Sequence, residues 1–472
     1  MVMIIFPWVE SLGGAGKRDC GLKPVRRLWL KAPLAILGDD ASGGLVVEGA
    51  RIVEILGSGQ QPAQAVDEVF DCSSHVILPG LINTHHHFYQ TLTRAHPAAI
   101  NKELFDWLTA LYPVWASSVN RDSFRIATRL ALTELLLSGC TTASDHQYLF
   151  PAGIEDALDI QAEEAAAIGM RITLNRGSMD LSKKDGGLPP DSVVQDTHVI
   201  LADSERVISR YHDADEGSMC QVALAPCSPF SVTTELMRQS ADLARKCGCR
   251  LHTHLGETHD EDAYCIEKFG CRPVEYLEQT GWLENRTWLA HGIHFDDGEI
   301  ARLGRHGVGV CHCPTSNMVL ASGSCRTLEL ERAGAPVGLG VDGSASNDSS
   351  NLMEGVRHAL MVNRLTYGAA AVTHLDALRW ATSGSADCLG RNDIGAIEVG
   401  KQADLALFTL DELRFSGAGD PLAALVLCGA HRADRVMVAG RWLVEDGQPV
   451  NVDIERLRRE HGEAAKTTLA MP

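Results

Sequence analysis

Histidines and carboxylates that could bind a metal ion recur after four separate apolar segments of the chain. The segments are 76–82, 250–253, 287–290 and 337–341, and the residues that follow them are His85 and His87, His254 with Glu257, His291, and Asp342. Imidazole nitrogens and carboxylate oxygens are ligands for divalent cations such as zinc, and a bound cation can activate water for hydrolysis. Each group alone would be a weak signal. The ordered set predicts a metal-dependent hydrolytic site.

The first group is the run His85-His86-His87, which closely follows a Pro-Gly pair at the end of an apolar segment. Side chains alternate between the two faces of an extended chain, so His85 and His87 are expected to point the same way. Two imidazoles on one face can bind one cation at about 2.0–2.1 Å each. His86 is expected to point away from the cation and to have a structural role.

The second group contains two histidines at the same spacing, His252 and His254. By the same alternation both face one side, and His254 lies nearer the end of the segment, so it is the better ligand. His252 either supports the site from behind the ligands or fills the interior. Glu257 follows on the next loop, where it could be a catalytic group or a solvated surface carboxylate.

The last two groups each contribute one residue. His291 ends an apolar segment, although a single histidine in this position is more often structural. Asp342 ends another and is followed by Gly343, which makes it a candidate ligand or base. The alternative for Asp342 is a helix N-cap, but Ser344 and Ser346 could cap a helix equally well.

Strand and helix patterns alternate about eight times through the middle of the chain, which predicts parallel strands with helical crossovers. The expected strands are 76–82, 141–144, 171–174, 221–225, 250–254, 287–291, 307–311 and 337–341, and the clearest helices are 121–138, 154–168 and 234–247. A (β/α)8 TIM-type barrel is the natural closure, and it would gather the carboxyl ends of its strands at one face. An open doubly wound sheet is the alternative, although no GxGxxG turn follows the first strand.

Both ends of the chain are rich in predicted strands. At the N-terminal end, segment 27–30 is mostly apolar and a hairpin is predicted from 45–48 and 51–56. At the C-terminal end, a strand is predicted at 403–410 and a second hairpin from 435–438 and 441–444. We expect the two ends to pair into one smaller β-sandwich, with two separate appendages as the alternative. The predicted organisation is an N-terminal extension at 1–24, the β-sandwich at 25–78 and 396–472 with a C-terminal tail, and the catalytic barrel at 79–395.

The amino-acid composition indicates which binding partners and which cellular compartment to expect. The 472 residues carry a formal charge of −19, and a surface this acidic repels the phosphates of nucleic acids. The 14 cysteines are scattered without a CxxC pair, so we expect small buried apolar residues and a reducing cytoplasm. No apolar stretch reaches the length of a membrane span. A homo-oligomer is compatible with the sequence, which does not determine the oligomeric state.

The sequence resembles the amidohydrolase superfamily in four segments, 79–87, 254–257, 290–291 and 340–342. Within the superfamily it is most similar to the branch of cytosine, guanine and adenosine-type deaminases and triazine hydrolases. The resemblance implies one divalent metal, with zinc expected and iron or nickel as alternatives, because segment 221–232 lacks the lysine that bridges two metals in binuclear members. It implies the metal ligands His85, His87, His254 and Asp342. It also implies that Glu257 shuttles protons and that His291 orients the water and the intermediate. The chemistry agrees, because Asp342 can take the proton of the water while it stays near the metal.

The expected substrate is a nitrogen heterocycle that bears an amino group. Gln90 could pair with a ring amide, and Trp115 could stack on the ring, as could Phe105, Trp107 or Tyr112 from the same segment. The loop 312–317 could also line the pocket. The pattern around Gln90 and 111–115 is most similar to bacterial deaminases of 8-oxoguanine, which form urate and ammonia. Isoxanthopterin, guanine and triazines are alternative substrates, and a metal-binding protein without turnover is the alternative from another class.

Overall fold

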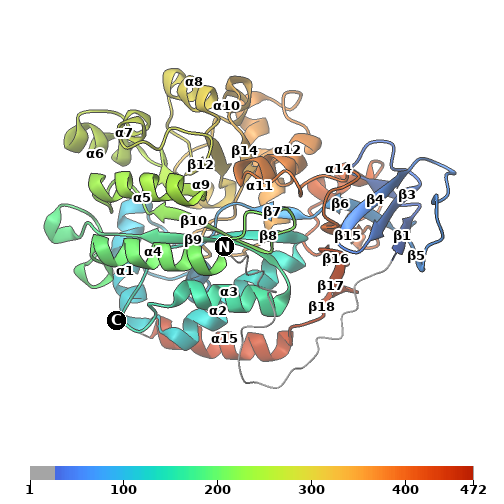
Figure 1. Ribbon diagram of the computed structural model, residues 1–472, viewed down its shortest axis with the longest axis horizontal. Helices are drawn as coiled ribbons and strands as arrows, with labels where there is room; N and C mark the ends of the chain where they lie inside the picture. The colour runs from blue at the N-terminus through green and yellow to red at the C-terminus, as the bar shows by residue number, and fades with distance from the viewer. Residues whose placement is uncertain (1–26, 471–472) are drawn as a thin grey trace, which may run out of the picture.

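The computed structural model describes residues 27–470 and contains a barrel beside a smaller β-domain (Figure 1). The predicted extension at 1–24 lies outside the described residues. The predicted architecture, a (β/α)8 barrel with a β-sandwich built from both chain ends, is confirmed. Within the described residues no helix is long and apolar enough to cross a membrane.

The barrel consists of eight parallel strands that follow one another in chain order. They are β7 (Leu81–Asn83), β8 (Cys140–Gln147), β9 (Arg171–Ser178), β10 (Cys220–Pro226), β11 (Arg250–Leu255), β12 (Thr287–His291), β13 (Gly309–His312) and β14 (Val337–Leu339). Backbone hydrogen bonds close the ring between its first and last strands, from Thr84 N to Leu339 O at 3.0 Å and from Asp342 N to His85 O at 3.1 Å. The first and last metal-ligand candidates therefore meet where the barrel closes.

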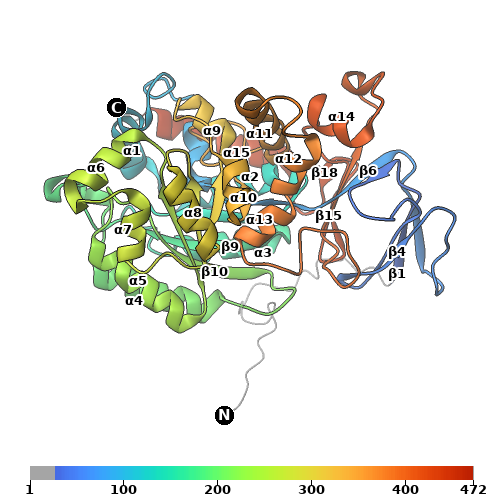
Figure 2. The same cartoon turned by 90° about the horizontal axis from the view of Figure 1, so that it is seen from above.

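Helices surround the barrel (Figure 2). The longer ones are α1 (Leu104–Ser118), α2 (Arg121–Leu137), α3 (Ala157–Ile168), α4 (Thr197–Tyr211), α5 (Thr234–Cys247), α6 (His259–Phe269), α8 (Asp297–His306) and α11 (Leu352–Tyr367). The shorter ones are α7 (Pro273–Gln279), α9 (Pro314–Val319), α10 (Thr327–Ala333), α12 (His374–Trp380), α13 (Ser383–Cys388) and α14 (Pro421–Leu427). Helix α5 coincides with the predicted 234–247, because Thr233 caps its start and Gly248, at φ 73°, ends it.

The apolar segment 76–82 forms two strands, and the prediction of one continuous strand was wrong. Strand β6 (His75–Pro79) pairs with the β-domain, whereas β7 begins the barrel. The break lies at Gly80, whose N–H donates to Asp404 O at 2.8 Å. A Cβ at Gly80 would lie 2.2 Å from Oγ1 of Thr141, so this close passage between the two sheets requires glycine.

The smaller domain consists of two facing sheets. One sheet contains β1 (Arg27–Lys31), β3 (Gly44–Glu48), β4 (Arg51–Leu56) and β5 (Glu68–Asp71). The other contains β2 (Ala35–Ile36), β6, β15 (Leu405–Thr409), β16 (Arg435–Val438), β17 (Arg441–Glu445) and β18 (Gln448–Pro449). One buried apolar cluster joins the sheets, with Leu28 and Val47 from the first and Ile77 and Leu407 from the second. Apolar faces from both chain ends therefore bury one another.

The chain returns from the β-domain to the barrel through α15 (Ile454–Leu469), the red helix along the lower edge in Figure 1. This helix packs against α2 and against the short helix η1 (Phe88–Thr93), which directly follows the histidine run. His461 Nε2 lies 3.2 Å from Thr91 Oγ1. The sequence predicts only a tail in this region, but the last helix supports the segment that carries Gln90.

A buried ion pair joins the two domains. Nε of Arg171, on β9, donates to Oδ2 of Asp404 at 2.6 Å, and both side chains are only 1% exposed. Arg171 also donates to Oε1 of Gln402 at 3.0 Å. We expect Asp404→Ala to lower the free energy of unfolding by about 3–5 kcal/mol, because it leaves the guanidinium buried without its counter-ion.

Urea unfolding measures this effect. The matched control is Arg458→Ala, which breaks an exposed pair with Glu455 and should cost at most about 0.5 kcal/mol. Equal unfolding free energies for the two variants would show that the buried pair does not hold the domains together.

Candidate active site

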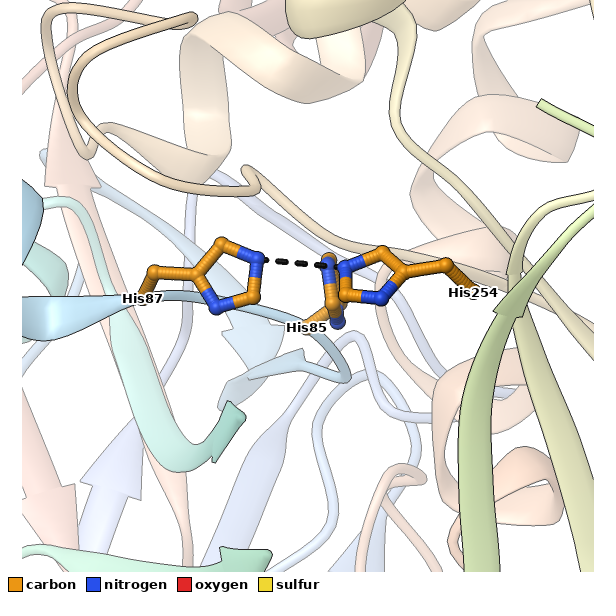
Figure 3. A group of neighbouring side chains, drawn as sticks. All are labelled: His85, His87 and His254. Atoms are coloured by element: carbon orange, nitrogen blue, oxygen red, sulfur yellow. Dashed lines mark hydrogen bonds between the residues drawn. The ribbon is translucent and has the colours of Figure 1, made fainter. Parts of the chain in front are cut away.

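Three histidines and one aspartate converge at the carboxyl ends of the barrel strands. Nε2 of His87 and Nε2 of His254 lie 3.2 Å apart (Figure 3). Oδ1 of Asp342 lies 3.3 Å from Nε2 of His85 and 3.3 Å from Nε2 of His87. Ligand atoms placed tetrahedrally at 2.0–2.1 Å from one cation are about 3.3 Å apart. The spacing of these atoms therefore fits a single four-coordinate ion.

The outer nitrogens of two of these histidines are held by backbone carbonyls. Nδ1 of His87 donates to the carbonyl of His146 at 2.8 Å, and Nδ1 of His254 donates to the carbonyl of Cys227 at 2.7 Å. Because a carbonyl can only accept, the proton of each neutral ring is on Nδ1. Each Nε2 therefore presents a lone pair to the centre of the site.

A relay fixes the third histidine in the same tautomer. Nδ1 of His252 donates to the carbonyl of Trp288 at 2.9 Å, which leaves Nε2 of His252 as an acceptor. That Nε2 lies 2.8 Å from Nδ1 of His85 and accepts a hydrogen bond from it, so the proton of His85 is on Nδ1. Nε2 of His85 then also carries a lone pair and has no hydrogen-bond partner. Of the two sequence-based alternatives for His252, the structure favours support of the site.

The electrostatics of this cluster favour a bound cation. Burial lowers the pKa of His85, His87 and His254, so the rings are neutral and the nitrogen lone pairs that converge on the centre repel one another. Figure 3 shows the ring nitrogens of His87 and His254 facing one another. Burial disfavours charge on Asp342, but the imidazole of His85 beside it favours the ionised form and holds the pKa of Asp342 well below its usual value. Three neutral nitrogens and one carboxylate form a donor set that suits zinc and other divalent transition metals.

The hydrogen-bond relay from His252 to His85 is expected to contribute to the affinity for zinc. His252→Phe keeps a ring that can stack on Trp288, which lies 4.4 Å away between centroids, but removes the acceptor for His85. We expect zinc affinity to fall about 10–100-fold, the usual cost of losing an outer partner of a ligand. Competition with a chromophoric chelator measures the affinity, and His358→Phe, on helix α11, is the control. An unchanged affinity in His252→Phe would show that the relay does not orient His85.

Glu257 and His291 lie together beside the cation-binding cluster. Oε2 of Glu257 is 3.4 Å from Nε2 of His291, and both side chains are buried. Burial raises the pKa of Glu257 to about 7, so this carboxyl can both give and take a proton near neutral pH. Glu261, on the first turn of α6, accepts from Gly256 N at 2.8 Å and fixes the loop that carries Glu257. Glu257 is therefore not a solvated surface carboxylate.

A cavity opens directly over these groups, with about 410 Å³ of space that includes a part open to solvent. Its polar lining is His87, Gln90, Tyr112, Tyr148, Ser228, His254, Glu257, His291, Asp342 and Ser346, and its other lining residues are Leu104, Trp107, Leu108, Cys227, Phe230 and Leu320. The lining combines aromatic and aliphatic surface with polar groups, which suits a flat, neutral ligand that can form hydrogen bonds.

Comparison with known proteins identifies the family. The amidohydrolase family matches residues 76–443, which is most of the chain. The chain belongs to the amidohydrolase family. It is 60% identical to an 8-oxoguanine deaminase of Pseudomonas aeruginosa over 94% of this chain and 99% of that protein. It is 34% identical to an isoxanthopterin deaminase from an unknown prokaryotic organism over 85% of this chain and 86% of that protein.

A solved structure supports the same family. The zinc complex of an atrazine chlorohydrolase from Arthrobacter aurescens is 31% identical to this amidohydrolase and aligns with a TM-score of 0.87. The alignment covers 93% of this chain and 99% of the other. The predicted resemblance to the amidohydrolase superfamily is confirmed.

Of the two residues expected to bind substrate in this amidohydrolase, the structure brings one to the cavity. Gln90 lines it. Trp115 is fully buried outside the lining, where its Nε1 donates to Oγ1 of Thr93 at 3.0 Å. Trp107, from the same helix, lines the cavity instead. The segment 312–317, predicted as a loop, comprises the end of β13 and the start of helix α9. It contributes no lining residue, although it contacts two groups of the site.

Several lining residues of this amidohydrolase were missed by the sequence analysis. Tyr148 follows β8, and Ser228 and Phe230 follow β10, each beyond the carboxyl end of a barrel strand. The predicted strand 141–144 ended too early, because β8 continues through the polar residues Asp145 to Gln147. A polar run directly after a barrel strand was the signal that could have identified Tyr148.

Proposed function

We propose that this amidohydrolase is a zinc-dependent deaminase that converts 8-oxoguanine and water to urate and ammonia. The observation that supports this most strongly is the 60% identity to an 8-oxoguanine deaminase across nearly the full length of both chains. The site agrees with this activity because a buried acid, a buried base and a cation-binding cluster face one small cavity.

In this proposal His85, His87, His254 and Asp342 hold the zinc ion. When bound, the cation lowers the pKa of water and so promotes its attack on the substrate. Asp342 accepts the proton of the attacking water, because its carboxylate faces the centre of the cluster and stays ionised. Ser316 Oγ donates to Oδ2 of Asp342 at 2.6 Å and keeps the other oxygen turned toward the histidines.

Glu257 provides the general acid. Protonation of the ring nitrogen next to C2 reduces the aromatic stabilisation of the substrate and makes C2 open to attack. Glu257 then helps to move the proton that converts the departing amino group to ammonia. His291 donates from Nδ1 to Oδ1 of Asn317 at 3.0 Å, so its Nε2 is free to accept a hydrogen bond from the attacking water.

Gln90 and the aromatic wall would recognise the base. The amide of Gln90 can donate and accept together, which matches the O=C–N–H edge of an oxopurine. Trp107, Tyr148 and Phe230 supply aromatic surface around a planar ligand. Because the substrate is neutral and flat, no cluster of basic residues is needed to bind it. We also place the protein in the cytoplasm, where its small-molecule substrate would be available.

Ammonia release from a panel of heterocycles tests the proposal. The panel is 8-oxoguanine, isoxanthopterin, guanine, cytosine and a hydroxytriazine. We expect urate and ammonia from 8-oxoguanine, with kcat/KM at least tenfold above every other compound. A preference for isoxanthopterin, favoured by the 34% identity to its deaminase, would reassign the substrate to pterins. Inactivity with all five compounds would refute the proposed substrate class.

A further inference from the structure

Two neighbouring residues of the short helix α9 contact different groups of the active site. Oγ of Ser316 donates to Oδ2 of Asp342 at 2.6 Å. Oδ1 of Asn317 accepts from Nδ1 of His291 at 3.0 Å. Both side chains are buried, with at most 1% of their surface exposed, so water does not compete for these bonds.

Both contacted residues have a backbone that L-amino acids rarely adopt. His291 has φ 74° and Asp342 has φ 67°, in the left-handed region, and each is followed by glycine. Such a conformation persists when surrounding contacts enforce it, and it is concentrated at functional sites. The hydrogen bonds from α9 reach the side chains of these two residues.

The two oxygens of Asp342 are held separately. Oδ1 accepts from Gly343 N at 2.7 Å and faces His85 and His87 at 3.3 Å. Oδ2 is turned away toward Ser316, and a second hydroxyl, from Ser346, lies farther off at 3.4 Å. Without Ser316 the carboxylate would lose its short bond on this side and could rotate about its χ2 torsion.

The backbone of α9 is itself well held. Pro314 begins the helix, Asn317 N donates to Cys313 O at 3.0 Å, and Ser322 N donates to Asn317 O at 2.8 Å. Helix α9 also packs against α11. A rigid turn of helix can therefore fix the directions of two adjacent side chains.

We propose that Ser316 and Asn317 are positioning residues, with Ser316 orienting the Asp342 carboxylate toward the cation and Asn317 fixing the tautomer and rotation of His291. The inference deepens the proposed function, and its first test needs no substrate. Because the two residues contact different groups, substitution of Ser316 should change the rate of zinc release, whereas substitution of Asn317 should change kcat.

For Ser316, zinc release from the loaded protein to an excess of chelator is the first measurement. We expect Ser316→Ala to release zinc about 10–100-fold faster, as found for the loss of other outer partners of metal ligands. Ser316→Thr keeps the hydroxyl and should restore release to within threefold of the parent. Release from Ser316→Ala at the parental rate would overturn the role of Ser316, whatever the substrate of the enzyme is.

For Asn317, steady-state kinetics on zinc-saturated protein is the second measurement. We expect Asn317→Leu, which has a similar volume, to lower kcat about 10–100-fold with KM within threefold and zinc release unchanged, because His291 is not a proposed ligand. Asn317→Asp keeps an acceptor and should retain a higher kcat than Asn317→Leu.

The matched control is Thr315→Val, which removes a hydrogen bond from the same helix to His358. It should keep kcat and zinc release within twofold of the parent. Equal losses in Thr315→Val and Asn317→Leu would show that α9 has only a structural role. An unchanged kcat in Asn317→Leu would overturn the role of Asn317.

Discussion

Glu257→Gln lowers kcat by about 10²–10⁴-fold, the usual contribution of a general acid–base group, while the protein keeps its metal. The amide has nearly the same shape as the carboxyl but cannot transfer a proton. Glu257 is buried and its pKa is raised to about 7, so the parent can supply a proton to the ring nitrogen near neutral pH. The increase in urate absorbance measures kcat, and elemental analysis measures bound metal.

The control for this variant is Glu267→Gln, an exposed position on helix α6. It should turn over at the parental rate. A Glu257→Gln variant within threefold of the parent, with metal bound, would remove Glu257 from the mechanism and leave His291 as the nearest group for proton transfer.

Removal of the metal reduces turnover by at least about 10³-fold, because a bound cation contributes several kcal/mol to the reaction. Dialysis against a chelator prepares the metal-free protein. Zinc should restore activity at one equivalent per chain, whereas magnesium, which prefers six oxygen ligands, should not. We also expect the melting temperature to fall, since an ion that binds only the folded state stabilises it.

The substitution His254→Ala is expected to remove the metal by removing one of its proposed ligands. Nε2 of His254 is 3.2 Å from Nε2 of His87, so its loss removes one of three converging nitrogens. The variant should purify with little metal and with activity close to that of the metal-free parent. Full activity in metal-free protein would contradict the assignment of this cluster as the catalytic metal site.

The convergence of the site could be predicted because it depends on regular geometry. Alternation along the chain brings His85 and His87 to one side, and closure of the barrel brings Asp342 next to them. The side chains converge although β7 ends at Asn83 and the histidines follow it in backbone that belongs to no strand. The catalytic and metal-binding roles of these residues, and the boundaries of the domains, are not tested by this geometry and stay predictions.

Contacts between distant segments could not be predicted. The segment 76–82 has one unbroken apolar pattern, yet Gly80 divides it because Asp404 and Thr141 approach from other parts of the chain. The role of His252 depends on a hydrogen bond to the carbonyl of Trp288. Neither contact leaves a pattern in the local sequence.

Aromatic residues of α1 show a similar limit. Trp107 and Trp115 are eight residues apart, which places them about 80° apart around the helix. Trp107 lines the cavity, whereas Trp115 packs between Tyr89 and Tyr112. The sequence of this segment shows that several aromatic side chains are close together, but only the orientation of the helix determines which of them reach the cavity.

Deamination of 8-oxoguanine in ¹⁸O-labelled water tests the proposed activity most directly. Mass spectrometry of the product would follow a reaction with zinc-loaded protein, and ammonia would be measured in the same sample. The proposal predicts urate with one ¹⁸O atom and one ammonia per urate, because water supplies the oxygen that replaces the amino group. Unlabelled urate, or no urate from metal-loaded protein, would contradict hydrolytic deamination of this substrate.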